Sequence, residues 1–162
     1  MTSTQQFLVI GGMVLLSLLA LNFYRASDIQ YDMKYENEAT ITATSIAQSI
    51  FEEMNTKAFD EKCIGKTASL PDSLTAKANL GKDAGENDRS KFDDIDDYNG
   101  YLLPDSSMGL GKFDATVLVN YVVRSDPNTV SVNPTFTKRA TIFVSNGYLK
   151  KGQLEYSYAF SY

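Results

Sequence analysis

Residues 7–24 read FLVIGGMVLLSLLALNFY, an apolar run with no charged side chain. At the α-helical rise of ~1.5 Å per residue, the run is about as long as the hydrocarbon core of a bilayer is thick. Phe23 and Tyr24 end it, as aromatic residues do at a membrane interface, and the long side chain of Arg25 can extend toward the headgroups. We therefore predict a transmembrane helix over residues 7–25, preceded by a short N-terminal tail of residues 1–6.

Two other interpretations of this run stay open. A secretory signal has a basic N-terminal region and a small-residue cleavage site, whereas residues 1–6 carry neither Lys nor Arg. A core helix of a globular domain is the second alternative, although the length and the position of the run favour a membrane anchor.

The helix is expected to continue past the membrane, because no Gly or Pro occurs between Gly12 and Gly65. Its apolar residues then recur at spacings of three and four, which is the pattern of an amphipathic helix. They are Ala39, Ala43, Ile46, Ala47, Ile50, Met54 and Ala58. One long helix is predicted from about Thr4 to about Phe59, with residues 26–59 outside the membrane.

Residues 60–112 lack a sustained period and are punctuated by Gly and Pro, so we predict a long variable loop. Short helical turns are expected near Leu74–Ala78 and near Asp93–Tyr98.

Residues 92–100 of this loop, FDDIDDYNG, allow two interpretations. Carboxylate oxygens are the ligands that Ca²⁺ prefers, and Asp93, Asp94, Asp96 and Asp97 would supply them, although their spacing differs from that of an EF-hand. Alternatively, Phe92, Ile95 and Tyr98 recur every third residue, so one helical turn would bury them and leave the aspartates in water. The second interpretation is favoured, and no other cofactor is expected.

In residues 113–162 the period changes to two, which indicates β-strands. Strands are predicted over 113–124, 136–145 and 153–162, with turns at Asp126-Pro127-Asn128 and at Asn146-Gly147. The last strand gathers its large side chains on one face, and that face needs a cover. They are Leu154, Tyr156, Tyr158, Phe160 and Tyr162. The expected fold is α+β, with the long N-terminal helix packed on a C-terminal antiparallel β-meander.

Composition argues against several functions. The net charge is −5 and Lys and Arg do not cluster, so nucleic-acid binding is not expected. The chain has no His and one cysteine, Cys63, so Ser-His-Asp catalysis, His-ligated metal sites and an internal disulfide are excluded. We predict that the protein is not an enzyme.

The order of these parts resembles that of type IV pilin-like proteins, namely minor pilins and type II secretion pseudopilins. Residues 43–54, ATSIAQSIFEEM, look like the periplasmic half of their long helix, and residues 92–98 look like an acidic segment of some minor pilins. The N-terminus is atypical for that family. Gln5 and Gln6 stand where most pilins carry a glutamate, no basic leader precedes the apolar run, and Gly11-Gly12 lies inside it.

The resemblance implies a structural or assembly subunit of a pilus-like or type II secretion-like apparatus, with other pilin-like subunits as its partners. It also implies a single pass through a bacterial inner membrane, with the N-terminus cytoplasmic and the C-terminal domain (residues 26–162) periplasmic or in a filament. The small residues Gly11, Gly12, Ser17 and Ala20 are expected to allow close packing between helices in the bilayer. The alternative is a standalone envelope-anchored binding module for a polysaccharide or a protein ligand.

Overall fold

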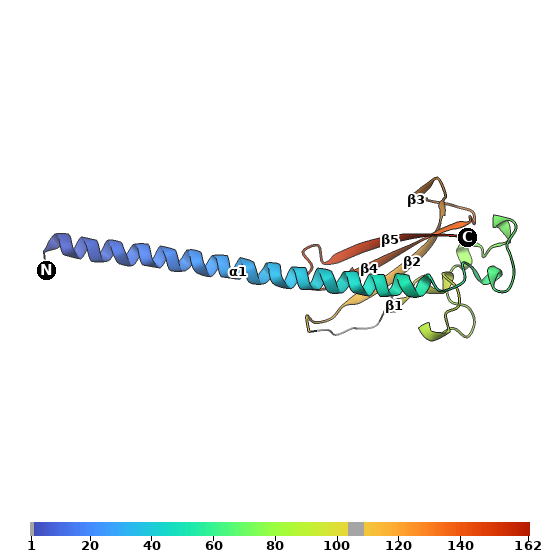
Figure 1. The fold of residues 1–162 in the computed structure, drawn as a ribbon, viewed down its shortest axis with the longest axis horizontal. Helices are drawn as coiled ribbons and strands as arrows, with labels where there is room; N and C mark the ends of the chain where they lie inside the picture. The colour runs from blue at the N-terminus through green and yellow to red at the C-terminus, as the bar shows by residue number, and fades with distance from the viewer. Residues whose placement is uncertain (1, 104–108) are drawn as a thin grey trace. The chain divides into compact units, whose positions relative to one another are not determined.

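The computed structural model describes residues 2–103 and 109–162, so residues 104–108 of the predicted loop lie outside the described part. The chain forms two compact units, Met1–Glu38 and Ala39–Tyr162. Helix α1, Ser3–Met54, begins in the first unit and ends in the second, and the strands of the sheet all lie in the second (Figure 1). The predicted α+β class, a long N-terminal helix with an antiparallel sheet, is confirmed.

The first unit is helical from Ser3 onward, and none of its side chains between residues 2 and 38 is buried. The helix that begins here is long and apolar enough to cross a membrane. Its apolar side chains are largely exposed, so this part of α1 presents an uncovered apolar surface.

In the second unit, the predicted apolar stripe of α1 is the helix's contribution to the core. Its buried residues are Ala39, Ala43, Ile46, Ala47, Ile50 and Met54. Three of these six are alanines, and all three are completely buried. The amphipathic second half of α1 is thus confirmed.

The helix ends at Met54, so the predicted end at Phe59 is wrong. Its last turn tightens where the amides of Thr56 and Lys57 bond the carbonyls three residues back. Ala58 has then left the helix and forms a parallel bridge with Asp94. The backbone bonds of that bridge replace the helical ones, because buried peptide groups need partners.

The sheet has five antiparallel strands, with β1, β2, β4 and β5 in that spatial order and β3 paired with β2. Their bounds are β1 Leu102–Leu103, β2 Asp114–Val123, β3 Asp126–Val130, β4 Thr137–Ser145 and β5 Gln153–Ser161. The three predicted strands correspond to β2, β4 and β5. Strands β1 and β3 are additional.

The two predicted turns had different outcomes. The chain turns at Arg124 and Ser125, and Asp126-Pro127-Asn128 instead opens β3, so the turn prediction there is wrong by two residues. The turn after Asn146 is present. The Asn146 side chain accepts a bond from the amide of Tyr148 and donates to the carbonyls of Leu110 and Lys112, so it fixes both the turn and a neighbouring loop.

The aromatic face of β5 packs against α1, as predicted. The rings of Phe51 and Tyr158 are stacked with centroids 4.1 Å apart, and Phe160 lies next to Phe51. The hydroxyls of Thr44 and Tyr156 are 2.8 Å apart. Offset ring contacts of this kind hold aromatic pairs in one geometry, so the stripe and the strand fix each other.

The described part of residues 60–112 contains five short 3₁₀ turns and strand β1. The turns are η1 Glu61–Cys63, η2 Pro71–Ser73, η3 Lys77–Asn79, η4 Arg89–Lys91 and η5 Asp96–Tyr98. Asn99 joins this segment to the sheet, because its side-chain oxygen accepts the amide of Val119 and its nitrogen donates to the carbonyl of Leu80. The segment is anchored to the core at several points.

Candidate functional site

The first feature with functional potential is the exposed apolar part of α1. Phe7, Leu16 and Phe23 are each more than 70% exposed, and the apolar window of the helix has no buried residue. A soluble monomer rarely leaves so large a continuous apolar surface uncovered. This surface is therefore a candidate contact site for lipid, for other helices, or for both.

The four small residues predicted to form a packing interface all lie on this exposed stretch, and nothing lies within 4 Å of a Cβ built on Gly11 or Gly12. Because successive residues turn by about 100°, positions 11, 12, 17 and 20 do not share one face. The Ser17 hydroxyl donates to the Met13 carbonyl 2.8 Å away, within its own helix. Each small residue lies in a different part of the helix surface, and Gly11 and Gly12 leave the largest gaps.

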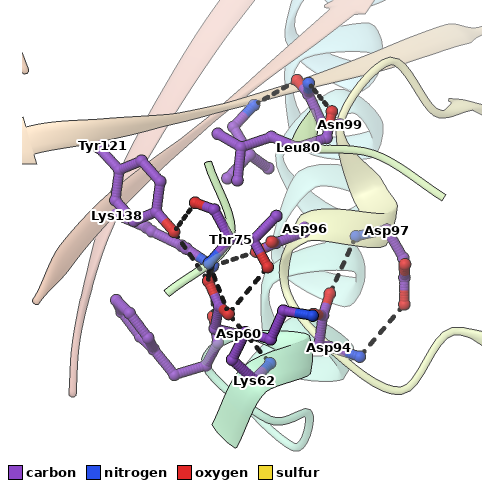
Figure 2. A network of polar contacts seen from close by, with 12 residues as sticks. Asp60, Lys62, Thr75, Leu80, Asp94, Asp96, Asp97, Asn99, Tyr121 and Lys138 are labelled. Atoms are coloured by element: carbon purple, nitrogen blue, oxygen red, sulfur yellow. Dashed lines mark hydrogen bonds and ion pairs between the residues drawn. The ribbon is translucent and has the colours of Figure 1, made fainter. Parts of the chain in front are cut away.

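A second feature is a buried network of charged groups around Lys138 on β4 (Figure 2). The Lys138 ammonium donates to the Asp60 carboxylate at 2.9 Å and to the Phe59 carbonyl at 2.7 Å, and it also contacts Asp96. It lies 4.7 Å from the centre of the Phe59 ring, close enough for a cation–π contact. One ammonium group thus binds three points that come from two distant segments of the chain.

Asp60 accepts more hydrogen bonds than any other residue of this network. Its carboxylate accepts bonds from the amide and hydroxyl of Thr75, from the Tyr121 hydroxyl and from the amide of Lys62. Burial would raise the pKa of Asp60, but the charge of Lys138 and these donors lower it below its ordinary value. Asp60 is therefore held as a carboxylate, and it ties η1 and the segment before η3 to the sheet.

The four aspartates of the 92–100 stretch do not converge on one point. Phe92, Ile95 and Tyr98 are buried as predicted, but three of the aspartates are buried with them, so the prediction that they remain in water is wrong for all except Asp93. The three are Asp94, Asp96 and Asp97. Lys138 and the peptide groups of the turn make this burial possible, since a buried carboxylate needs donors.

The three buried aspartates have two roles. Asp97 accepts the amides of Asp93 and Asp94, and Asp94 accepts the amide of Asp97, so the two carboxylates close the turn reciprocally. Asp96 points to Lys138 with one oxygen, and its other oxygen is buried without a hydrogen-bond partner among the described residues. These carboxylates serve the turn and the ion pair rather than a common ligand.

Burial raises the pKa of Asp94 to about 8, assisted by the neighbouring charges of Asp96 and Asp97. Burial likewise raises the pKa of Asp96 to about 6, although Lys138 counteracts it. The cluster therefore holds protons at pH values where ordinary aspartates are ionised.

The carboxylates that do approach one another are Glu86, Asp93 and Asp97, whose oxygens lie within 4.8 Å of one another. Burial and a hydrogen bond with Asp97 raise the pKa of Glu86 to about 7. Asp97 already accepts hydrogen bonds from two backbone amides. The three carboxylates therefore resemble a hydrogen-bonded carboxyl pair more than the ligand set of a metal ion.

A third contact set joins the end of α1 to the η4–η5 segment, and no pattern in the sequence predicts it. Arg89 binds the Glu53 carboxylate with two nitrogens, and the Tyr98 hydroxyl donates to the same carboxylate at 2.6 Å. Burial would raise the pKa of Glu53, but the bonds from Arg89 and Tyr98 outweigh burial and lower it.

A fourth feature is a hollow of about 450 Å³ between η1 and η2. Lys62, Lys66 and Ser73 are among the residues that line it.

Comparison of the chain with models of protein families, with curated proteins and with solved structures found no match. The class of protein is therefore defined by the fold alone. It is an α+β protein whose N-terminal helix is long and apolar enough to cross a membrane and continues into the core of an antiparallel-sheet domain.

Proposed function

We propose that this protein is a membrane-anchored, non-enzymatic subunit of a pilus-like or type II secretion-like assembly. One observation carries the proposal: a single helix has an uncovered apolar first part and a second part whose buried stripe packs under an antiparallel sheet. The first part suits lipid or neighbouring helices, and the second part holds a folded domain at its end. A pilin-like subunit needs both.

The chemistry of the folded domain agrees with a structural role. The buried polar groups of the described residues bind one another and tie loops to the core, as Asp60 and Lys138 do. Pilin-like insertion would place the N-terminus in the cytoplasm and residues 26–162 outside it, with other pilin-like subunits and an assembly apparatus as partners.

The experiment is expression of the full-length chain in a bacterium that carries a pilus-type assembly system. We expect the protein in the membrane fraction after an alkaline wash, and part of it in the sheared filament fraction. Deletion of residues 2–25 should release the remainder from the membrane. Recovery of the full-length chain as a soluble monomer without detergent would contradict the proposal, and mass analysis of its N-terminus would show whether it is trimmed and methylated.

A second candidate, a standalone envelope-anchored binding module, is favoured by the hollow between η1 and η2. Its size is within the range of small-ligand sites, about 300–1,000 Å³, and its lysines would suit an anionic sugar or peptide. Membrane retention without entry into filaments, together with binding of an anionic polysaccharide that Lys62→Ala abolishes, would favour this candidate.

A further inference from the structure

Lys138 holds a completely buried amine between two carboxyl groups. Its Nζ donates to Asp60 at 2.9 Å and also contacts Asp96, whose side chain is only 3% exposed. The ring centres of Phe59 and Tyr121 lie 4.7 and 5.1 Å from the same nitrogen. An amine is thus kept against a carboxyl group in an interior site with aromatic walls (Figure 2).

The two carboxyl groups beside Lys138 differ in their hydrogen bonds. Asp60 accepts bonds from the hydroxyls of Thr75 and Tyr121, which stabilise its charged form. Asp96 has one oxygen on Lys138, whereas its Oδ2 is buried and has no hydrogen-bond partner among the described residues. A charged carboxylate with an unpaired buried oxygen is costly, and burial raises the pKa of Asp96 to about 6. Asp96 is therefore the carboxyl group that takes up a proton more readily.

We propose that the Lys138 amine and the Asp96 carboxyl group condense to an isopeptide bond inside the folded domain, with Asp60 as the proton relay. The ammonium first passes one proton to the Asp96 oxygen that it contacts, which gives a neutral amine and a carboxylic acid. The amine nitrogen then attacks Cγ of Asp96. A second proton moves from the nitrogen by way of Asp60 to the Asp96 hydroxyl, which departs as water. One C–N bond forms, one C–O bond breaks, and the step needs neither an oxidant nor a reductant.

The site favours this condensation by position and by burial. Nζ is held by Asp60 and by the Phe59 carbonyl at 2.7 Å, and such positioning replaces an encounter between two separate molecules. The Asp96 oxygen in contact with Nζ is one covalent bond from Cγ, so the nitrogen has only to move from the oxygen to the adjacent carbon. The product is a neutral amide, and its formation removes the cost of keeping two charges in the interior.

The bond joins η5 to β4, two segments whose linked residues lie 42 positions apart in the sequence. The reaction occurs once in each chain, so it is a self-modification and not a turnover. The inference goes beyond the proposed function and does not rest on it, because all the groups involved lie in the second unit. The ion pair is the state before the reaction, and its pH dependence is that of the unlinked chain.

Mass analysis of the detergent-solubilised full-length chain tests the proposal after the folded chain has been kept near neutral pH. Trypsin should release one branched peptide in which residues 92–112 are joined to residues 125–139, because a linked Lys138 is no longer a cleavage site. Its mass should be the sum of the two linear peptides less one molecule of water. Fragmentation of the branched peptide should place the link at Asp96.

Four variants assign the roles. Lys138→Met and Asp96→Ala each remove a reacting group and should abolish the branched peptide. Asp60→Asn keeps both reacting groups but cannot relay a proton, so the peptide should form roughly a hundredfold more slowly. Asp94→Asn is the matched control. Its carboxyl group is buried in the same turn but forms no ion pair with Lys138 among the described residues, so the yield should stay unchanged.

The wild-type chain alone can overturn the proposal, whether or not the variants fold. A chain that is folded by circular dichroism but releases the two peptides separately would show that no bond forms. Loss of water without a branched peptide would indicate a succinimide at an aspartate, and would equally overturn it. A link at Asp60, or an unchanged rate in Asp60→Asn, would contradict the assigned roles of the two aspartates.

Discussion

The ammonium group of Lys138 lies 2.9 Å from the Asp60 carboxylate, and both side chains are completely buried. Lys138 belongs to β4, and Asp60 follows the end of α1 after a short bend, so this contact joins the helix exit to the middle of the sheet. Paired charges are tolerated in a protein interior because each satisfies the other. The pair fixes the chain to the sheet just after it has left the helix.

Replacement of Lys138 by Met should destabilise the protein strongly. The Asp60 and Asp96 carboxylates would remain buried without their cation, and the loss of one partner of a buried ion pair costs about 3–5 kcal/mol. Urea unfolding of the detergent-solubilised chain, followed by tyrosine fluorescence, measures the change. Lys150→Met, at an exposed position, is the matched control and should change the free energy of unfolding by less than about 0.5 kcal/mol. Equal effects of the two substitutions would contradict the role of Lys138.

The stability of the fold should fall as the pH rises from about 4 to about 8. The folded pKa values of Asp94, about 8, and Asp96, about 6, lie above the ~3.9 of an unfolded aspartate. The folded state therefore holds more protons than the unfolded state in this window, and stability decreases with pH wherever that is so. The contribution is fully present below the unfolded pKa and is lost as the pH passes the folded values.

Denaturation midpoints at a series of pH values measure this slope, and Asp94→Asn should flatten it. Asp72→Asn removes an exposed carboxylate of the same loop, outside this cluster, and controls for the change in net charge. A slope that both variants alter equally would argue against a buried proton at Asp94. Below about pH 4 the trend should reverse, because the lowered pKa values of Asp60 and Glu53 make stability fall as these groups are protonated.

Truncation of Phe51 should loosen the helix from the sheet. Its ring stacks on Tyr158 and also touches Phe160, and it is partly exposed, so Phe51→Ala should reduce the free energy of unfolding by about 2–3 kcal/mol. Phe23→Ala, on the exposed part of α1, is the comparison and should leave unfolding of the sheet domain unchanged. If Phe51→Ala matched Phe23→Ala, the stacking would contribute little to stability.

A bulky side chain at Gly12 should impair association without harming the fold. No atom of the chain lies within 4 Å of a Cβ at this position, so Gly12→Leu meets no obstacle within the molecule, and replacing a mid-helix glycine favours the helix itself by up to about 1 kcal/mol. Circular dichroism should therefore show an intact fold, while lateral association in membranes decreases. Normal assembly of the Gly12→Leu protein would show that this side of the helix is not packed.

The helix and the sheet could be predicted because their apolar residues recur at regular spacings. The stripe from Ala39 to Met54 follows the helical repeat, and the alternation in β5 places its aromatic side chains on one face. The end of the helix could not be predicted from the sequence in the same way. Residues 55–59 suit a helix locally, and the chain leaves it because Ala58 pairs with Asp94, a contact between segments far apart in sequence.

The buried network was missed for a related reason. A prediction from the hydrophobic pattern leaves every aspartate exposed to water. An aspartate is buried only where a cation or other donors compensate for the loss of water, and here the cation comes from a distant part of the chain. The alternation in β4 did indicate one of its members. Lys138 lies on the same face of the strand as Ala140, Ile142 and Val144, all of which face the core. A lysine in that series points inward, and it requires carboxylates to receive it. The alternation in β4 therefore indicated a buried ion pair, although not which aspartates would form it.

Asn99 has a consequence for how this molecule can diversify. Its side-chain amide occupies the place that a backbone carbonyl would take if β1 extended further along β2, and so satisfies the amide of Val119. One side chain thereby does for Val119 what a longer β1 would otherwise do. A change of length within the exposed residues 64–67 would alter the outer surface of the domain while the contacts of Thr75, Leu80 and Asn99 stay in place, so this short stretch is where the surface can vary without disturbing the sheet.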